Sequence, residues 1–307
     1  MTSSTSTISV AVDAQISIDG DKHCFGKFID KTTVEKVQNN KGSICGAAHQ
    51  SSHLVQPGRE MVAFTLLLDL TAEVLDTCLP LMSLGAPAAN VYTCNESVAT
   101  FDTIVNKVAA NHKYTTCRVG RWAIRGQRGS MPAILQLDCV AATETDNGAT
   151  TYTPPGTLSS IYTFPDSTFK YGPTAGPLVE YPVDRFAIVS DLNLFKQWNN
   201  TTSLTDAVVT VQETFLAVSV PYLSTSKAIY WDNRDTQTDR WVQLGLVSGA
   251  TSQDTLTYDA KYSQFVSKSP DIVSKLSEIR LPLSWQAAND ADNTPPNAFT
   301  FTHVNGA

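Results

Sequence analysis

The sequence lacks the long apolar runs of a membrane-spanning protein, since no stretch approaches the roughly 18–20 apolar residues that a membrane helix needs. The first ten residues, MTSSTSTISV, lack the basic start and apolar run of a signal peptide, so we expect synthesis in a cytoplasm. Basic residues are also few: 22 Lys and Arg against 29 Asp and Glu leave a net charge of −7. This balance excludes the overall basic character that is typical of nucleic-acid-binding proteins.

Common catalytic and nucleotide-binding motifs are missing as well. The sequence contains no Walker loop, no GxGxxG after a predicted strand, no HExxH and no GxSxG. Two carboxylate pairs, Asp69 with Glu73 and Asp254 with Asp259, lie at predicted strand–helix boundaries. We interpret them as helix caps and solvated side chains. The sequence therefore predicts no catalytic residue and no cofactor, and indicates that the protein is not an enzyme.

The six cysteines all lie in the first half of the chain, without short CxxC spacing. Three of them, Cys78, Cys117 and Cys139, fall inside apolar runs, where cysteine acts as a small buried hydrophobic residue. We expect reduced, structural thiols.

One group has the composition of a metal site. Cys45, His49 and His53 are spaced four residues apart, with His23 and Cys24 upstream, and thiolate plus imidazole is a zinc ligand set. The segment GAAHQSSH is rich in Gly and Ser, and a fourth ligand would have to come from elsewhere. We therefore favour surface histidines in a loop and predict no metal, while a zinc site at Cys45, His49 and His53 stays open.

The composition is that of a folded protein, with 42% hydrophobic residues over 307 positions, enough for two domains or one large all-β unit. We divide the chain into an N-terminal arm with loops, a first β half with a helix, a linker or arm rich in proline and aromatic residues, and a second β half. These ranges are 1–60, 61–145, 146–182 and 183–307.

In the first β half, MVAFTLLLDL predicts a buried strand over 61–70, followed by an amphipathic helix over 71–84. Thr71 is a suitable N-cap, Glu73 brings an acid to the first turn, and Pro80 should kink or shorten the helix. Residues 97–112 have apolar residues at helical spacing, which favours a helix over one arm of a hairpin. The runs 118–126 and 132–142 predict a β-hairpin around a glycine turn.

A cluster of four arginines accompanies this hairpin, at positions 118, 121, 125 and 128. In a strand, Arg121 and Arg125 would share the face opposite Trp122. Three roles stay open for the cluster: plain solvation, a contact with an adjoining subunit, or binding of phosphates.

Residues 144–182 contain six prolines and many aromatic residues, and we interpret them as an extended arm or a linker packed on a neighbour. The second half predicts strands over 206–222, 227–232, 240–247, 279–287 and 298–304, a helix over 258–266, and a helix start at Ser269-Pro270-Asp271. The order of predicted elements over 61–84 and 118–142 is repeated over 240–266 and 279–304, which indicates two related halves.

The segment YTTCRVGRWAIRGQRGSMPAILQLDCVA resembles the hairpin of tail tube proteins of long-tailed bacteriophages. FTLLLDLTAEVLDTCLPLMSLG is similar to the helix that flanks the sandwich of that family, and VVTVQETFLAVSVPY and LTYDAKYSQF are similar to the later part of two-part tube proteins. The resemblance covers about residues 60–145 and 185–304. It implies a mainly β, sandwich- or barrel-forming tail tube fold with short flanking helices.

The resemblance also implies a structural virion protein, made in the host bacterial cytoplasm and located in the tail. Copies of the chain would form stacked rings around a hollow tube, contact other tail proteins, and let double-stranded DNA pass without specific binding. Strand edges would be closed by identical neighbours. The alternatives are another virion protein, such as a tail-tip, decoration or host-recognition β-sandwich with exposed aromatics in 152–181, and a hydrolase on a β scaffold.

Overall fold

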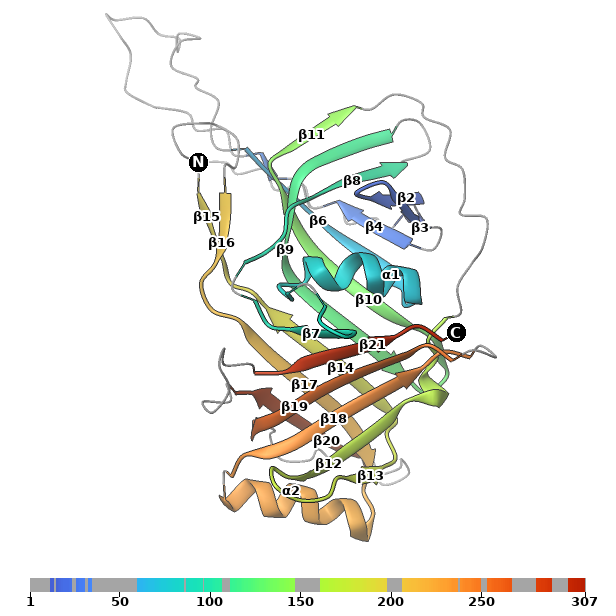
Figure 1. Cartoon of the computed structure of the whole chain (residues 1–307), viewed down its shortest axis with the longest axis vertical. Helices are drawn as coiled ribbons and strands as arrows, with labels where there is room; N and C mark the ends of the chain where they lie inside the picture. Colours follow the sequence, from blue (N-terminus) through green and yellow to red (C-terminus); the bar gives the residue numbers. More distant parts are fainter. Residues whose placement is uncertain are drawn as a thin grey trace, which may run out of the picture.

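The computed structural model shows a mainly β protein with two α-helices in the part of the chain that it describes (Figure 1). No helix among these residues is long and apolar enough to cross a membrane. The described residues are 12–13, 15–23, 26–30, 33–34, 60–85, 87–95, 97–106, 111–146, 161–197, 206–236, 238–249, 253–266, 280–288 and 298–306.

One antiparallel sheet runs through most of the molecule. Its strands follow one another in space as β1 (Val12–Asp13), β4 (Gly26–Asp30), β6 (Glu60–Asp69), β10 (Ser130–Ala141), β9 (Asn111–Gln127), β14 (Arg185–Asp191), β17 (Glu213–Pro221), β20 (Arg280–Ala287), β19 (Thr255–Phe265), β18 (Arg240–Val247), β12 (Thr168–Pro173) and β13 (Val179–Tyr181). Strand β21 (Thr300–Val304) lies between β19 and β7 (Val91–Thr93), and β5 (Thr33–Val34) pairs with β6.

Strand β9 belongs to two sheets at once. Its second part pairs with β10 and β14 in the main sheet, and its first part lies between β8 (Phe101–Asn106) and β11 (Thr143–Asp146). Strands β2 (Gln15–Ile18) and β3 (Asp21–His23) extend this upper sheet beyond β8. Figure 1 shows β9 curving from the upper sheet into the main one.

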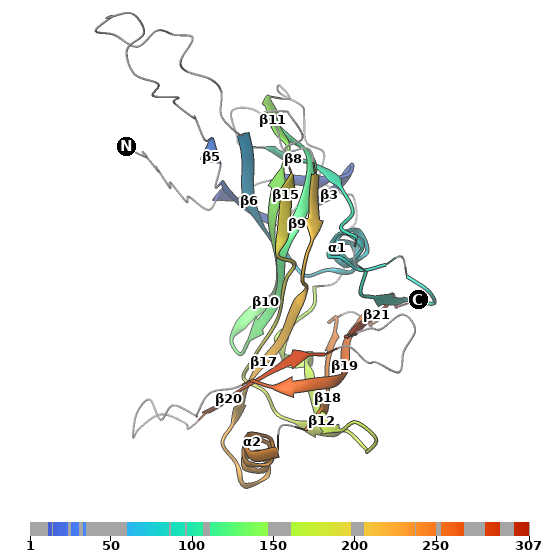
Figure 2. The same cartoon turned by 90° about the vertical axis from the view of Figure 1, so that its left-hand side faces the viewer.

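The main sheet turns at β20, so that β18, β19 and β21 form a second layer that faces β9, β10, β14 and β17 (Figure 2). Aromatic side chains fill the space between the layers. The ring of Trp122 on β9 lies 5.8 Å from the ring of Phe301 on β21, and Trp285 on β20 lies 5.5 Å from Phe169 on β12. A single apolar core therefore joins both layers.

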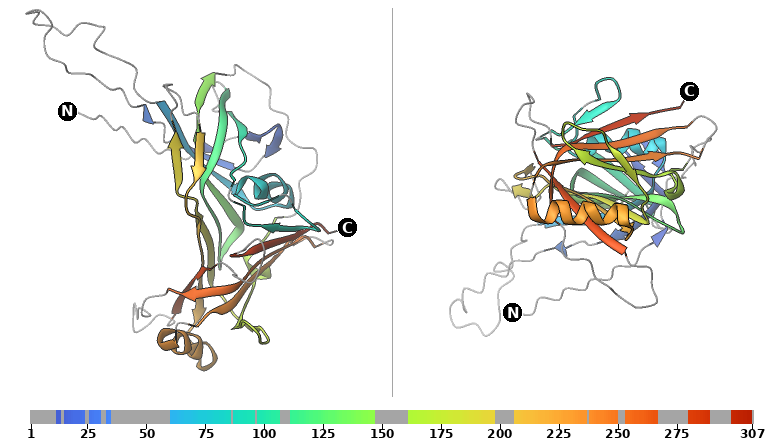
Figure 3. Two further views of the ribbon diagram at one scale, coloured as in Figure 1. Left: turned by 60° about the vertical axis from the view of Figure 1, so that its left-hand side comes forward. Right: turned by 90° about the horizontal axis from the view of Figure 1, so that it is seen from below.

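The two helices close the ends of this core. Helix α1 (Ala72–Cys78) runs into the 3₁₀ turn η3 (Leu79–Leu81), and the backbone carbonyl of Met82 just after it accepts a 3.1 Å hydrogen bond from Trp122 Nε1. Helix α2 (Ser224–Thr236) lies across the opposite end, as the view from below in Figure 3 shows. Its Asn233 is buried and hydrogen-bonds to the hydroxyl of Tyr171.

Several elements agree with the sequence. The expected strand 61–70 is β6, and the Oγ1 atom of Thr71 caps α1 by accepting a hydrogen bond from the backbone N–H of Val74. Pro80 shortens the helix as expected, because the chain continues from Leu79 as a 3₁₀ turn. The hairpin of 118–126 and 132–142 is confirmed as parts of β9 and β10, and the strands at 240–247, 279–287 and 298–304 correspond to β18, β20 and β21.

The helix favoured over 97–112 is wrong, because β8 and the start of β9 form a hairpin there. Burial alternates along β8, with Phe101, Thr103 and Val105 inside. Because the buried residue in the middle of this alternation is Thr103 and not an apolar residue, the two-residue period of a strand was not visible in the sequence. The same error occurs at 258–266, where β19 buries Leu256, Tyr258 and Ala260 in alternation.

Two further segments differ from expectation in the second half. Residues 227–232, expected as a strand, belong to helix α2. The single long strand expected over 206–222 is two strands, β16 (Asp206–Val209) and β17, separated by residues 210–212. The helix start at Ser269 lies outside the described residues. Because 258–266 is a strand, the pairing of helices that suggested two related halves is wrong.

The segment 144–182 is in part a core element rather than an arm. Four of its aromatic residues are buried in the main core: Tyr162, Phe164, Phe169 and Tyr171. The four are therefore not available as an exposed recognition surface, and Tyr152 lies outside the described residues. Strand β14 of the second half pairs along its whole length with β9 of the first, so one sheet passes through both halves. The domain boundaries themselves stay predictions.

Candidate functional site

A two-stranded ribbon extends the hairpin of β14 and β17 beyond the main sheet. It consists of β15 (Leu194–Gln197) and β16, which pair only with each other in the described part of the chain. The chain enters it through Asn193, whose φ of 42° lies in the left-handed region. Thr210 Oγ1 donates a 2.6 Å hydrogen bond to the Asn193 carbonyl, so the two sides of the hairpin stay together at the ribbon's base.

One face of the ribbon rests on the body of the protein. Leu194 and Val209 pack against the core, and Arg118 on β9 hydrogen-bonds to the Asp206 carboxylate and the Ala207 carbonyl. Because side chains alternate along a strand, the opposite face carries Phe195 and Val208. Figure 1 shows the ribbon to the left of β9, with helix α1 on the other side of that strand.

Phe195 and Val208 form an exposed apolar pair, which we call the knob. They are direct cross-strand partners, and the two residues are 59% and 42% exposed. Val211, at the ribbon's base, is 56% exposed. A two-stranded hairpin alone is at best marginally stable in water. Exposure of an apolar pair on its face to water is unfavourable, and burial against another surface would be favourable. The knob therefore has the character of a contact surface.

A hollow of about 520 Å³ opens on the outer face of the main sheet, the face opposite the Trp122 side chain. One register row crosses five strands there: Ile134, Arg125, Ala187, Ala217 and Ser284. Two neighbouring residues of the row are alanines, with Arg125 on one side of them and Ser284 on the other. Pro132 and Pro282 complete the apolar lining.

Two arginines border this hollow, Arg125 on β9 and Arg185 on β14. Neither forms an ion pair within the described part of the chain. Arg128 and Arg280 lie nearby and share the buried carboxylate of Asp184, at 3.8 and 3.7 Å. The end of the sheet around the hollow is therefore basic, although the chain as a whole is acidic.

The opposite end of the same outer face is acidic. Asp191 and Glu213 are cross-strand partners at the ends of β14 and β17, directly before the ribbon begins. Arg121 pairs in register with Asp138 on one side and Asp191 on the other. The sheet thus carries its exposed charges at two separate ends, with the knob next to the acidic end.

The four arginines singled out in the sequence have different environments. Arg121 and Arg125 are exposed on the face opposite Trp122, as predicted from the strand period. Arg118 instead anchors the ribbon, and Arg128 interacts with Asp184. No local sequence pattern indicated the hollow, because Ala187 and Ala217 become neighbours only through the pairing of β14 with β17.

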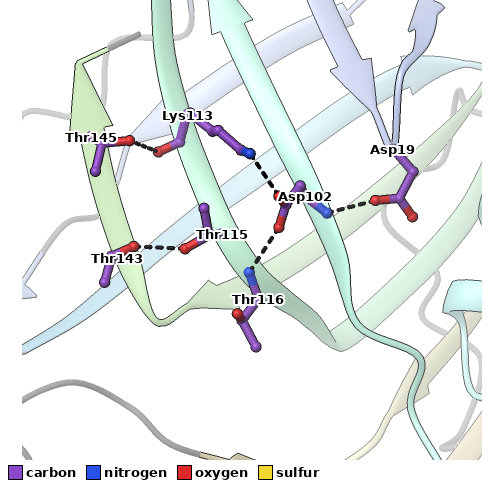
Figure 4. Close-up of polar contacts among 7 residues, drawn as sticks. All are labelled: Asp19, Asp102, Lys113, Thr115, Thr116, Thr143 and Thr145. Carbon is purple, nitrogen blue, oxygen red and sulfur yellow. Dashed lines mark hydrogen bonds and ion pairs between the residues drawn. The ribbon is translucent and has the colours of Figure 1, made fainter.

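A polar cluster surrounds the bend of β9 (Figure 4). Thr116 has a φ of 51°, and its backbone N–H donates a 3.1 Å hydrogen bond to Asp102. The same carboxylate lies 2.9 Å from Lys113 Nζ, while Asp19 accepts a hydrogen bond from the Asp102 backbone. These groups satisfy one another at a β-bulge, so we assign them to the shape of β9 rather than to ligand binding.

The other carboxylates, cysteines and histidines singled out in the sequence either have structural roles or lie outside the described residues. Asp254 accepts a hydrogen bond from the Ser248 hydroxyl and Asp259 one from Trp241 Nε1, while Glu73 lies in the first turn of α1 as predicted. Asp69 has a raised pKa because burial disfavours its charge. Cys24, Cys45, His49 and His53 lie outside the described residues, as does the side chain of His23. The described residues hold no group of three or more metal-ligating side chains.

The described cysteines are free thiols, and Cys78, Cys117 and Cys139 are buried as expected. Burial raises the pKa of Cys94 to about 11, and burial likewise raises the pKa of Cys139. The nucleophilic form of cysteine is the thiolate, so both sulfurs are protonated and unreactive near neutral pH.

His303 on β21 and Asp76 on α1 form a pair that joins the second layer to the helix. The Nδ1 atom of His303 lies 3.0 Å from an Asp76 oxygen, and its buried Nε2 atom has no hydrogen-bond partner. This resembles the histidine–carboxylate half of a hydrolase triad. The side chain of His303 is only 2% exposed, however, so a substrate has no access to its ring.

We expect His303 to make the protein less stable in mild acid. Burial lowers the pKa of His303 below its usual value of 6.5, against the opposing effect of Asp76 and Asp254. The unfolded chain therefore binds the proton more tightly, and the free energy of unfolding should fall as pH drops through about 6.5 toward the lower native pKa. Urea unfolding of the wild type and of His303→Gln between pH 8 and 5 measures this. An equal slope in both proteins would contradict it.

No protein-family model matches this chain, and no curated protein matches it either.

Proposed function

We propose that this chain is a structural virion protein that assembles with copies of itself into the stacked rings of a phage tail tube. The observation that carries the proposal is the ribbon, which holds the exposed pair Phe195 and Val208 beyond the main sheet. A solvent-exposed apolar pair on a projecting hairpin is suited to a contact with another protein. The resemblance of the sequence to tail tube proteins indicates that the assembly is a tail tube.

Open strand edges also support self-assembly. Strand β13 pairs with β12 and has no second partner among the described strands. Its Val179 is 51% exposed, and Glu180 is exposed beside it. An uncovered edge is a template for a further strand, and a ring closes such edges against identical neighbours. In this proposal the tube surrounds the passing DNA, whose phosphates the acidic chain repels rather than binds.

Purified protein should form rings or tubes as its concentration rises. Negative-stain electron microscopy and light scattering after size-exclusion chromatography would be carried out over a concentration series. We expect a monomer at low concentration and closed rings or hollow tubes at high concentration, because the contacts are between copies of one chain. A folded protein that stays monomeric at every concentration would overturn the proposed function.

A further inference from the structure

We infer that the knob of one copy docks into the hollow of the next, as the head-to-tail contact of the assembly. The inference rests on the proposed function and specifies the two surfaces that meet. The knob is Phe195 with Val208 on the ribbon, and the hollow is the depression over Ala187 and Ala217.

The apolar chemistry of the two surfaces matches. The hollow is bordered by Ile134, Pro132 and Pro282 over an alanine floor. Its volume of about 520 Å³ leaves room for an aromatic ring together with a branched side chain. Burial of the ring removes apolar surface from water on both partners, and aromatic anchors in such depressions often dominate interface energies.

The charges around the two surfaces are complementary. Arg125 and Arg185 border the hollow without a carboxylate partner in the described part of the chain, and Asp191 and Glu213 flank the knob's base. In a contact between two copies, the two arginines would face charges of the opposite sign at the knob's base, where Asp191 also lies beside Arg121 of its own chain. Such complementarity fixes the register of a contact and excludes wrong partners.

The spacing along the strands also fits. Arg185 lies two residues before Ala187, and Asp191 lies four residues before Phe195. When Phe195 of one copy sits over Ala187 of another and the two strands run in the same direction, Asp191 falls about 7 Å beyond Arg185, at roughly 3.3 Å per residue. The flexible arginine side chain can cover that difference.

The knob cannot fill the hollow of its own chain. Phe195 lies eight positions after Ala187 on the same hairpin, about 26 Å along an extended strand. The contact is therefore between two different patches on two copies. A contact of this heterologous kind leaves a free knob on one copy and a free hollow on the other, so it joins many copies into a ring or a filament and does not stop at a dimer.

Charge exchange between the two surfaces tests the inference. Variant A carries Arg125→Glu and Arg185→Glu, which makes the border of the hollow acidic. Variant B carries Asp191→Asn and Glu213→Lys, which makes the knob's base basic. Asp191 Oδ1 accepts a 3.0 Å hydrogen bond from the backbone N–H of Asn193, and the amide oxygen introduced by Asp191→Asn can accept the same bond. Lys261→Glu, at an exposed position of β19, is the matched control for a reversed charge elsewhere.

We expect A and B each to raise the critical concentration for assembly at least about tenfold, because like charges face each other at every contact. An equimolar mixture of A and B should assemble near the wild-type concentration, since every A–B contact again joins opposite charges. The chain that carries all four changes should also assemble by itself. Circular dichroism would verify that each variant is folded, and Lys261→Glu should assemble as the wild type does.

The outcomes separate the two proposals. If the wild type assembles and A or B assembles equally well, the docking inference is wrong while the proposed function stands. Loss of assembly in A and B without recovery in the mixture also overturns the docking inference, because the two surfaces then do not face each other. If A alone loses assembly, the hollow holds something other than the knob. Absence of assembly in the wild type overturns both.

Discussion

Replacing Phe169 by alanine should lower the free energy of unfolding by about 3–5 kcal/mol, the cost of removing a fully buried aromatic ring. Phe169 is 0% exposed, and its ring centroid lies 5.5 Å from that of Trp285. Its strand, β12, lies between β13 and β18, and its ring is part of the apolar core. Urea unfolding followed by tryptophan fluorescence and circular dichroism measures the effect.

The matched control is Phe195→Ala on the ribbon. Phe195 is 59% exposed, so its loss should change the unfolding free energy by less than about 1 kcal/mol. Equal effects of the two substitutions would contradict the description of β12 as a core strand. The comparison also decides the role of residues 161–173, which the sequence indicated as part of an arm and which the structure places in the core.

Replacing the ribbon by a tight turn should abolish assembly and leave a folded chain. Residues 194–209 would be exchanged for Asn-Gly between Asn193 and Thr210, which already lie within a 2.6 Å hydrogen bond of each other. The deletion removes the knob and the anchoring contacts of Arg118 with Asp206 and Ala207, while β14 and β17 keep their pairing. Sedimentation velocity at high concentration measures the oligomeric state.

The control for this deletion is Arg118→Lys in the full chain, which shortens the anchor and keeps the ribbon and the charge. It should assemble with a modestly raised critical concentration. If the chain without the ribbon still formed rings or tubes, the ribbon would not be the element that carries assembly. If that chain were unfolded by circular dichroism, the ribbon would be part of the core, contrary to the exposure of its outer face.

The sequence predicted the strands that have a clear alternation or a continuous apolar run, such as β6, β10 and β18. It failed where a buried polar residue interrupted the period, as Thr103 does in β8 and Ser263 in β19. It also failed at α2, where the run of a β-branched and two aromatic residues at 229–231 favoured a strand. Ile229 and Tyr230 are buried next to each other, which does not fit the alternation of a strand.

The candidate site could be predicted only in part. The face of Arg121 and Arg125 follows from the strand period alone, because side chains point to alternate sides of a strand. The hollow does not follow from any local pattern: its alanines lie on β14 and β17, and its arginines on β9 and β14. Only the pairing of strands that are distant in sequence brings these residues into one row.

The position of β21 between β7 and β19 has a consequence for synthesis. Phe299, Phe301 and His303 complete a core whose earlier members, such as Trp122, leave the ribosome far sooner. The wall of the hollow on β20 likewise emerges long after the ribbon. A growing chain therefore exposes its knob before its hollow is complete. If the knob docks into the hollow as proposed, neighbouring nascent chains on one messenger cannot polymerise with each other before β20 has been translated.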